Sequence, residues 1–363
     1  MNLRPTLQQL SQTAGPTGHE ENVASLVAEL MRPLCDEVHT DPLFTVVGLK
    51  RGQGPEPRPK LALMAHLDEI FLLVTAIEGP FVRFAQHGYD PRLLVGQEVM
   101  VLGRQPLFGV IGDRPPHLLA GSERSHMPGA EDLVIDLGLD ADETAAQVSI
   151  GDAAIVQSGD GNASFVALLG ERVAGKALDN RLGVATLLAT LDALRGMRHP
   201  CDILAIANGG EELNHLGAAT TVFRLRPDLA IVLDVTFARQ PGVERDQSFP
   251  LGGGPVLGIG PNLHPLITAK LIETAEALEM AHGLEPLPAN TGTDAWAVEV
   301  TAGGIPCGLV GFPLRNMHSP VEVADLKDAT RSARLLATFA AQVDADFVAS
   351  LAYRLPDFAE KTP

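Results

Sequence analysis

Residues 201–217, CDILAIANGGEELNHLG, place an apolar run, Ile203 to Ala207, just before two glycines and two adjacent glutamates. Such a run is typical of a strand buried on both faces, as in the parallel sheet of an α/β protein. On a regular strand Glu211 and Glu212 would point to opposite faces. The glycines permit a sharp turn that could bring both carboxylates into one site. The plainer interpretation is a solvated loop or a helix's first turn.

The same pattern recurs along the chain and predicts an α/β fold. Further buried strands are expected at KLALMAHLDE (60–69), DLAIVLDV (228–235) and CGLVGF (307–312). Amphipathic helices are expected at residues 20–35, 177–196, 264–278 and 325–343, because apolar residues recur there at helical spacing. The glycine-rich run LGGGPVLGIG (251–260) matches no phosphate-binding motif and is interpreted as a flexible loop.

The sequence pattern is different between residues 72 and 168. Short β-like runs, FVRF, EVMVLG, LFGVIG and AAIVQ, alternate there with Gly, Pro and Asp turns. We therefore expect residues 1–71 to form the first part of an α/β domain and residues 72–168 to form an inserted small all-β domain. Residues 169–363 would complete the α/β domain.

Composition limits the possible partners and locations. The 363 residues carry a formal net charge of -18, which disfavours binding to nucleic acid and to anionic membranes. There is no apolar run long enough to span a bilayer, and the first residues lack the apolar core of a signal peptide. The three cysteines are odd in number and widely spaced. They are interpreted as reduced thiols, and a cytoplasmic location is expected.

Polar residues follow each predicted strand of the α/β part. They are His66, Glu211 with Glu212, Asp234 and His318, and Asp179 stands at the start of the helix 177–196. Sites in open α/β sheets form beyond the carboxyl ends of the strands, where these residues would meet. Each also has a plainer interpretation: Asp179 as a helix N-cap, Asp234 as a partner of loop backbone, and His318 as an ordinary loop histidine.

Two imidazoles and three carboxylates at one place suit a hydrolytic site with two metal ions. Mixed nitrogen and oxygen ligands favour zinc, with cobalt or manganese as alternatives. One carboxylate must bridge the ions, and another, which binds no metal, must take and deliver a proton. Adjacent glutamates after a strand could divide these tasks.

Six short motifs carry a resemblance to a known family. They are AHLDE (65–69), GKALDNR (175–181), GGEELNHLGA (209–218), LDVT (233–236), GTDA (292–295) and MHSPVEV (317–323). In this order they resemble the tetrahedral (TET) aminopeptidases of metallopeptidase family 42, which includes glutamyl and deblocking aminopeptidases. The likeness covers nearly the whole chain. It implies a zinc-exopeptidase-like mixed sheet flanked by helices, with an inserted PDZ-like β domain.

The resemblance also implies roles for single residues. His66 and Asp234 would bind one metal ion, Glu212 and His318 the other, and Asp179 would bridge them. Glu211 would act as general base and acid on a metal-bridged hydroxide, and Asp68 would orient His66. By the same likeness, Thr293 and Asp294 would lie near the substrate. Arg315, three residues before His318, would bind a substrate carboxylate or pair with a surface acid.

Substrate and assembly follow from the same likeness. The substrates would be short peptides with a free N-terminus. Family members form large hollow tetrahedral homo-oligomers built from dimers. One alternative is a metal-dependent deacylase or amidohydrolase that acts on N-acyl amino acids. The other is a catalytically inactive assembly or peptide-binding protein of the same fold.

Several positions depart from the family pattern without removing a ligand. They are Thr45, Asn180, Gly210, Leu213, Asn214 and Phe237. These departures concern the substrate pocket more than the reaction. The remaining histidines are interpreted as loop or surface residues: His19, His39, His87, His117, His126, His199, His215, His264 and His282.

Overall fold

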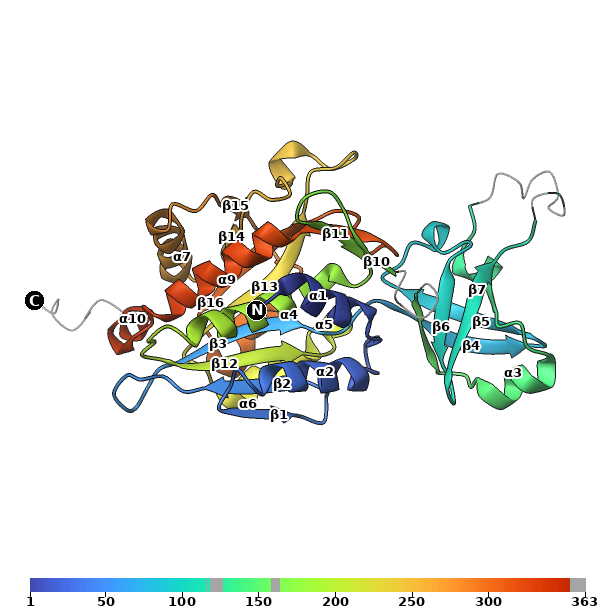
Figure 1. The fold of residues 1–363 in the computed structure, drawn as a ribbon, viewed down its shortest axis with the longest axis horizontal. Helices are drawn as coiled ribbons and strands as arrows, with labels where there is room; N and C mark the ends of the chain where they lie inside the picture. Colours follow the sequence, from blue (N-terminus) through green and yellow to red (C-terminus); the bar gives the residue numbers. More distant parts are fainter. Residues whose placement is uncertain (116, 118–126, 158–163, 353–363) are drawn as a thin grey trace, which may run out of the picture.

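An eight-stranded mixed sheet forms the centre of the molecule (Figure 1). The computed structural model describes residues 1–115, 117, 127–157 and 164–352. In spatial order the strands are β1 (Glu37–Thr40), β2 (Val46–Lys50), β12 (Asp202–Asn208), β3 (Lys60–His66), β13 (Leu229–Phe237), β16 (Cys307–Leu314), β14 (Val256–Ile259) and β15 (Gly283–Pro286). Strands β12, β3, β13 and β16 pair in parallel. The predicted mixed α/β architecture is confirmed.

Helices cover both faces of this sheet because successive strand residues point to opposite sides. Leu61 and Leu63 of β3 belong to one core, and Ala62 and Met64 to the other. The first core takes its helical residues mainly from α1 (Leu3–Gln12), α2 (Glu21–Met31), α4 (Leu178–Leu194), α7 (Pro265–Ala277) and α9 (Leu326–Ala340). The second takes them from α6 (Leu216–Leu225) and α8 (Ala295–Val300). The four predicted helices correspond to α2, α4, α7 and α9.

The prediction of a flexible loop at residues 251–260 is wrong in part. Val256–Ile259 form β14, which pairs with β16 and β15 inside the sheet. Gly258 permits this close packing, since a Cβ atom there would lie 2.7 Å from Leu263 Cδ1 and 3.1 Å from Leu309 Cβ. Glycines that suggested a loop therefore allow a strand to pack tightly.

A closed six-stranded barrel lies at one end of the molecule (Figure 1). Its strands, in order around the barrel, are β4 (Phe71–Glu78), β5 (Phe81–His87), β8 (Val134–Asp136), β7 (Pro106–Gly112), β6 (Glu98–Leu102) and β9 (Ala153–Val156). The barrel has an apolar core of its own, and it also carries helix α3 (Ala141–Gln147). The PDZ-like character of this module stays a prediction.

The chain returns from the barrel through a small antiparallel sheet. It consists of β10 (Phe165–Ala167), β11 (Arg172–Gly175) and β17 (Glu322–Asp325). This sheet leads directly into α4, and a short helix, α10 (Ala345–Ser350), follows α9. All three cysteines are free thiols. In the described part of the chain, every helix is too short or too polar to cross a membrane.

Candidate functional site

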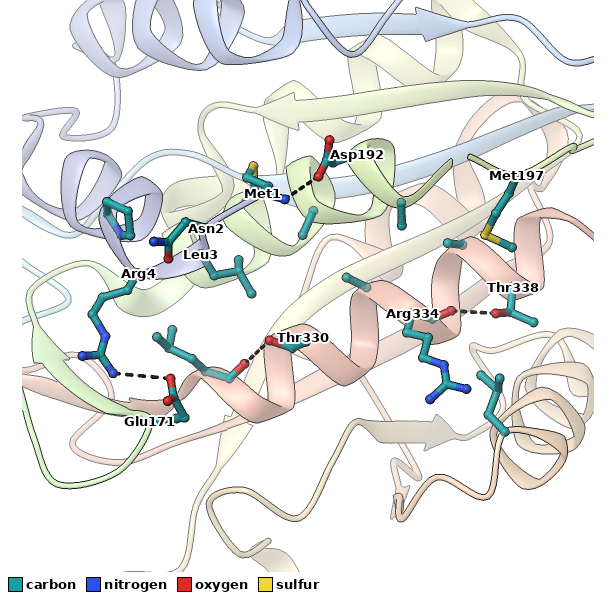
Figure 2. Close-up of a pocket in the computed structure, with 17 residues that line it drawn as sticks. Met1, Asn2, Leu3, Arg4, Glu171, Asp192, Met197, Thr330, Arg334 and Thr338 are labelled. Carbon is teal, nitrogen blue, oxygen red and sulfur yellow. Dashed lines mark hydrogen bonds and ion pairs between the residues drawn. The ribbon is translucent and has the colours of Figure 1, made fainter. Parts of the chain in front are cut away.

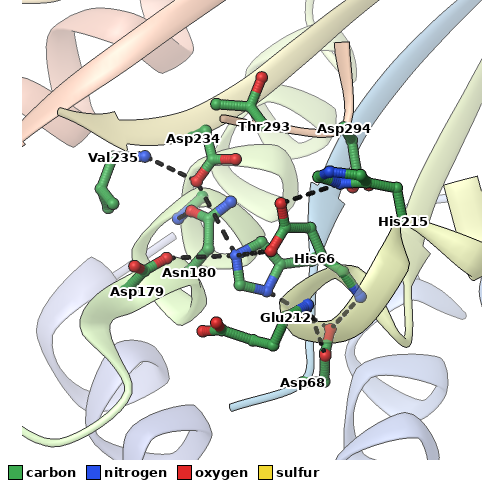
Figure 3. A network of polar contacts seen from close by, with 12 residues as sticks. His66, Asp68, Asp179, Asn180, Glu212, His215, Asp234, Val235, Thr293 and Asp294 are labelled. Carbon is green, nitrogen blue, oxygen red and sulfur yellow. Dashed lines mark hydrogen bonds and ion pairs between the residues drawn. The ribbon is translucent and has the colours of Figure 1, made fainter. Parts of the chain in front are cut away.

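The ends of the parallel strands bring the predicted site residues together. His66 is the last residue of β3, Asp234 lies in β13, and the short helix α5 (Glu211–Asn214) follows β12. His318 follows β16, and Asp179 stands at the start of α4. These side chains border a cavity of about 420 Å³ and lie close to one another (Figure 3). The site therefore forms at the carboxyl edge of the sheet, as parallel strands dictate.

Asp179 lies between the two histidines. Its Oδ1 atom is 3.1 Å from His66 Nε2, and its Oδ2 atom is 3.4 Å from His318 Nε2. Asp234 Oδ1 lies 3.8 Å from His66 Nε2, and Glu212 Oε2 lies 3.5 Å from His318 Nε2. The side chains thus form two groups with one member in common, His66–Asp179–Asp234 and Asp179–Glu212–His318.

Asp68 holds the turn that carries the two glutamates. Its carboxylate accepts hydrogen bonds from the backbone N–H groups of Glu211 and Glu212, at 3.1 and 3.2 Å, and from the hydroxyl of Thr17 at 2.7 Å. It also lies 3.4 Å from Nδ1 of His66. Gly210 makes the turn with φ +73°, a conformation that disfavours other residues. Asp68 therefore fixes the glutamates and the His66 ring together.

Asp179 is not a helix N-cap. Asp179 and Asn180 have non-helical backbone angles at the start of α4, and the side-chain oxygen Oδ1 of Asn180 accepts a hydrogen bond from the Gly183 N–H. Asn180 also donates from Nδ2 to the Leu233 carbonyl of β13, at 2.7 Å. Asn180 thus provides the local hydrogen bonds, and the Asp179 carboxylate is left to face the histidines.

Glu322 of β17 is a buried residue that sequence reasoning missed. Its carboxylate accepts hydrogen bonds from the backbone N–H groups of Asp179 and His318, each at 3.0 Å. One side chain thereby fixes the backbone beneath two predicted ligands. The signal in the sequence was weak, because Glu322 stands in the short segment VEV and resembles an exposed strand residue.

Burial and mutual repulsion dominate the electrostatics of the carboxylates. Burial and the neighbouring Asp179 charge raise the pKa of Glu212 well above its usual range. Burial raises the pKa of Asp234, although the charge of His66 opposes this effect. For Asp179, burial raises the pKa, but hydrogen bonds with His318 and His66 prevail and lower it. Burial and crowding thus disfavour the charged forms of Glu212 and Asp234, whereas the two histidines favour the charged form of Asp179.

These residues fit a pair of divalent cations. The donors are imidazole nitrogens and carboxylate oxygens, which suit zinc, cobalt and manganese. No lysine or arginine is among the described residues that line the cavity, so the acids lack a permanent cationic partner there. Two divalent cations would supply the positive charge that the buried carboxylates need.

Of the residues predicted to contact substrate, Thr293 and Asp294 lie at the cavity, whereas Arg315 lies outside its lining. Thr293 lines the cavity, and Asp294 is buried beside it. Asp294 accepts a hydrogen bond from the Asn208 side chain at 2.6 Å. Arg315 does not line the cavity, and its Nε atom donates to the Arg239 carbonyl at 2.9 Å.

Among the described residues, the expectation for the remaining histidines is wrong for His215 and His199, and His126 lies outside the described residues. His215 lines the cavity, with Nδ1 3.0 Å from Glu211 Oε1 and 3.3 Å from Asp294 Oδ1. These two carboxylates raise the pKa of His215 to about 10. His199 is buried, and its Nδ1 atom lies within hydrogen-bond distance of the Cys201 carbonyl oxygen. His215 was grouped with the loop or surface histidines, and its contact with the distant Asp294 was not visible in the sequence.

A second, larger cavity contains none of the predicted site residues. It measures about 1040 Å³ and lies between α1, α4 and α9 (Figure 2). The N-terminal amine of Met1 pairs with Asp192 at its rim, and Arg4 pairs with Glu171. Its floor consists of small and apolar residues such as Ala333 and Ala337. This cavity lacks the convergent acids and imidazoles of the site in Figure 3.

Comparison with known proteins identifies the family of this chain. Residues 45–335 match the model of the M42 glutamyl aminopeptidase family. The chain belongs to this family. The M42 chain is 30% identical to a lysyl aminopeptidase of Pyrococcus furiosus over 335 residues, which cover 91% of this chain and 94% of the relative. It is therefore a peptide-bond hydrolase of the aminopeptidase class, and its family is metal-dependent.

Solved structures of M42 relatives share the fold. A TET aminopeptidase from a marine sediment archaeon, Thaumarchaeota archaeon SCGC AB-539-E09, superposes with TM-score 0.89 at 28% identity and covers 96% of this chain and 99% of its own. The TET1 peptidase of Pyrococcus horikoshii, described as assembling into a tetrahedron or a large octahedral shell, has TM-score 0.81 at 25% identity. That match covers 94% of this chain and 100% of the relative.

Proposed function

We propose that this M42 chain is a dinuclear metal-dependent aminopeptidase that removes N-terminal residues from short peptides. The observation that carries the proposal is the position of Asp179, whose two carboxylate oxygens face two separate groups of imidazole and carboxylate donors. A shared carboxylate of this kind is what a two-metal hydrolytic site requires. Membership of the M42 family favours an aminopeptidase over a deacylase of N-acyl amino acids.

The proposed ligands divide between the two groups. His66 and Asp234 would hold one divalent cation, Glu212 and His318 would hold the other, and Asp179 would serve both. Zinc is the first candidate, with cobalt and manganese as alternatives, because no sulfur donor is present in the set. Bound cations polarise the scissile carbonyl group and make water acidic enough to be deprotonated near neutral pH.

Glu211 is the proposed general base and acid. One of its oxygens lies 3.0 Å from His215 Nδ1 and the other 3.8 Å from His66 Nε2, so the carboxylate lies beside the donor group that contains His66. It accepts a proton from water as the water oxygen attacks the scissile carbonyl carbon. It then donates this proton to the nitrogen of the departing peptide as the C–N bond breaks. Asp68 holds the Glu211 backbone and the His66 ring in position.

We propose that the substrate binds in the same cavity. Thr293, together with the His215-linked Asp294, forms the wall next to Glu211 and would position the N-terminal residue of the peptide. Arg315 lies outside the cavity lining, which favours contact with a more distant part of a peptide or a structural role in its loop. The cavity is therefore proposed to hold one residue and its free amino group.

The substitution Glu211→Gln tests the reaction. It removes the proton acceptor but retains a side chain of the same shape, so we expect kcat to fall about 10²–10⁴-fold. Metal content, measured by plasma mass spectrometry, should equal that of the wild type. Glu29→Gln, an exposed change on α2, serves as control and should keep full activity. Unchanged turnover of leucyl p-nitroanilide by Glu211→Gln would contradict the assigned role.

We further propose a large homo-oligomer built from dimers, in a cytoplasmic setting. The support is the likeness to the TET structures, one of which is described as forming a tetrahedron or an octahedral shell. We also retain the division into an α/β domain of residues 1–71 and 169–363 and an inserted β domain of residues 72–168, which the separate core of the barrel supports. Light scattering coupled to gel filtration tests the assembly. A monomer at micromolar concentration would contradict it.

A further inference from the structure

The cavity extends beyond the proposed metal ligands into a second half with apolar walls. Leu309 is 3% exposed, and with Leu287 and Phe237 it forms apolar sides to this half. Gly311 leaves room, since a Cβ atom there would lie 3.2 Å from Thr236 Cγ2. The walls suit the hydrocarbon part of a substrate side chain.

A single carboxylate lies among these apolar walls. Glu285 of β15 lines the cavity, and its Oε1 atom accepts a hydrogen bond from the Thr236 hydroxyl at 2.6 Å. Among the described residues, no lysine, arginine or histidine forms an ion pair with Glu285. Its Oε2 atom also has no protein hydrogen-bond donor in the described part of the chain. A ligand could therefore bind at this oxygen.

The strand that carries Glu285 has an unusual pattern of exposure. The leucine next to it, Leu284, is 45% exposed, whereas Glu285 is half-buried and faces the cavity. Burial raises the pKa of the Glu285 carboxyl, and only the Thr236 hydroxyl opposes this effect. A buried carboxylate is stable when a positive charge accompanies it, so a cation at this point would be strongly favoured.

Glu285 differs from the other acids of the cavity in one respect. The three carboxylates among the proposed ligands, Asp179, Glu212 and Asp234, lie within the two groups of donors that could hold cations. Glu211 and Asp294 share His215. Glu285 is left as a carboxylate with neither a metal nor an imidazole beside it.

We propose that Glu285 is a specificity-determining residue that selects a lysine or arginine side chain on the N-terminal residue of the peptide. The proposal rests on the aminopeptidase function proposed above. The methylene groups of such a side chain would pack against Leu309, Leu287 and Phe237, and its charged end would reach Glu285. No lysine or arginine is among the described residues that line the cavity, and the cationic His215 is already paired with Glu211 and Asp294. An acidic side chain would therefore find no free cationic side chain near Glu285.

Glu285 could instead have a purely structural role in the sheet. β15 is an edge strand, and charges that point inward on edge strands discourage pairing between sheets. That role predicts no effect on the choice of substrate, so substrate preference separates the two explanations.

The test compares matched substrates. We expect the metal-loaded wild type to hydrolyse lysyl and arginyl p-nitroanilides with kcat/KM about tenfold or more above the norleucyl and citrullyl analogues, which are similar in size and uncharged. Glu285→Gln retains the acceptor for Thr236 and should bring the ratio of lysyl to norleucyl kcat/KM close to one. Glu285→Asp keeps the charge and should keep the preference in part. Glu276→Gln, an exposed change on α7, is the control that removes the same charge elsewhere.

A second readout needs no catalysis. Calorimetry with free L-lysine and L-norleucine should show about tenfold tighter binding of lysine to the wild type, and no such difference for Glu285→Gln. The inference is overturned if the active wild type prefers norleucyl substrates. It is also overturned if the ratio of lysyl to norleucyl kcat/KM is unchanged in Glu285→Gln. In both cases the aminopeptidase function stays intact. A wild type inactive on every free-amino substrate overturns the proposed function instead. The calorimetric comparison then decides the role of Glu285, and equal binding of the two amino acids overturns it.

Discussion

Among single side chains, Asp179 differs from the other proposed ligands because each of its carboxylate oxygens faces a different histidine. Asp234 faces His66, and Glu212 faces His318. Removal of Asp179 therefore affects both donor groups, whereas removal of Asp234 affects one.

This difference predicts distinct metal contents. In Asp179→Ala we expect both ions to bind about 10–100-fold more weakly, so that the protein retains less than one ion after dialysis. Asp234→Ala should retain one ion, because the group around His318 is intact. Plasma mass spectrometry after dialysis measures the content, and circular dichroism confirms folding. Retention of two ions by Asp179→Ala would disprove the shared role.

The sequence indicates most clearly those candidate site residues that follow a buried strand. His66, Glu211, Glu212, Asp234 and His318 stand just after or within long apolar runs, and parallel strands place such positions side by side. Glu322 and His215 were missed for a physical reason. Their roles depend on backbone groups and acids that come from distant parts of the chain, and periodicity carries no information about such contacts.

Among the secondary-structure elements, α1, the end of β3 and the start of α4 meet at one buried carboxylate. Lys176 Nζ lies within hydrogen-bond distance of both Glu69 oxygens, at 2.9 and 2.6 Å, and an Arg181 nitrogen lies 3.4 Å away. Arg181 also donates to the Leu10 carbonyl at the end of α1. All three side chains are almost fully buried. Burial lowers the pKa of Lys176, and the charge of Glu69 opposes this effect.

We predict that Glu69→Gln lowers the free energy of unfolding by about 3–5 kcal/mol, because two buried cations lose their counter-charge. Equilibrium unfolding in urea measures the change. Glu171→Gln is a matched control, since it breaks the exposed pair with Arg4 of α1 and should cost far less. Equal losses in the two variants would argue against the buried cluster as the main link between these elements.

The elements differ in how clearly the sequence indicates them. β3, β12, β13 and β16 are continuous apolar runs and were predicted, because central strands are buried on both faces. β1, β2, β14 and β15 are short, and they contain glycine or charged residues. Their pairing is determined by neighbours that are far away in the sequence. The barrel strands were recognised as β-like runs, but closure into a barrel depends on pairing that no local pattern shows.

For the whole molecule, the proposed ligands link four elements of the α/β part, β3, α4, α5 and β13, and the segment between β16 and β17. Bound cations would therefore stabilise the folded state, since a ligand that binds only the native protein raises its stability. At concentrations 100 times the dissociation constant, each ion contributes about 2.7 kcal/mol.

We predict that removal of metal with a chelator lowers Tm by about 5 °C or more, and that added zinc, cobalt or manganese restores it. Differential scanning calorimetry at a fixed scan rate measures the shift. Chelator saturated with zinc beforehand is the control and should have no effect. A constant Tm, with metal loss verified by mass spectrometry, would show that the ions do not link these elements.

The proposed ligands are spread along almost the entire polypeptide, and this spread has a consequence for biosynthesis. His66 and its neighbour Asp179 are separated by 113 positions, and the whole barrel is made between them. His318 leaves the ribosome later still, after β16. With these ligands, a nascent chain could not assemble the site until nearly all of it has been translated, so a product terminated before β16 would lack peptidase activity.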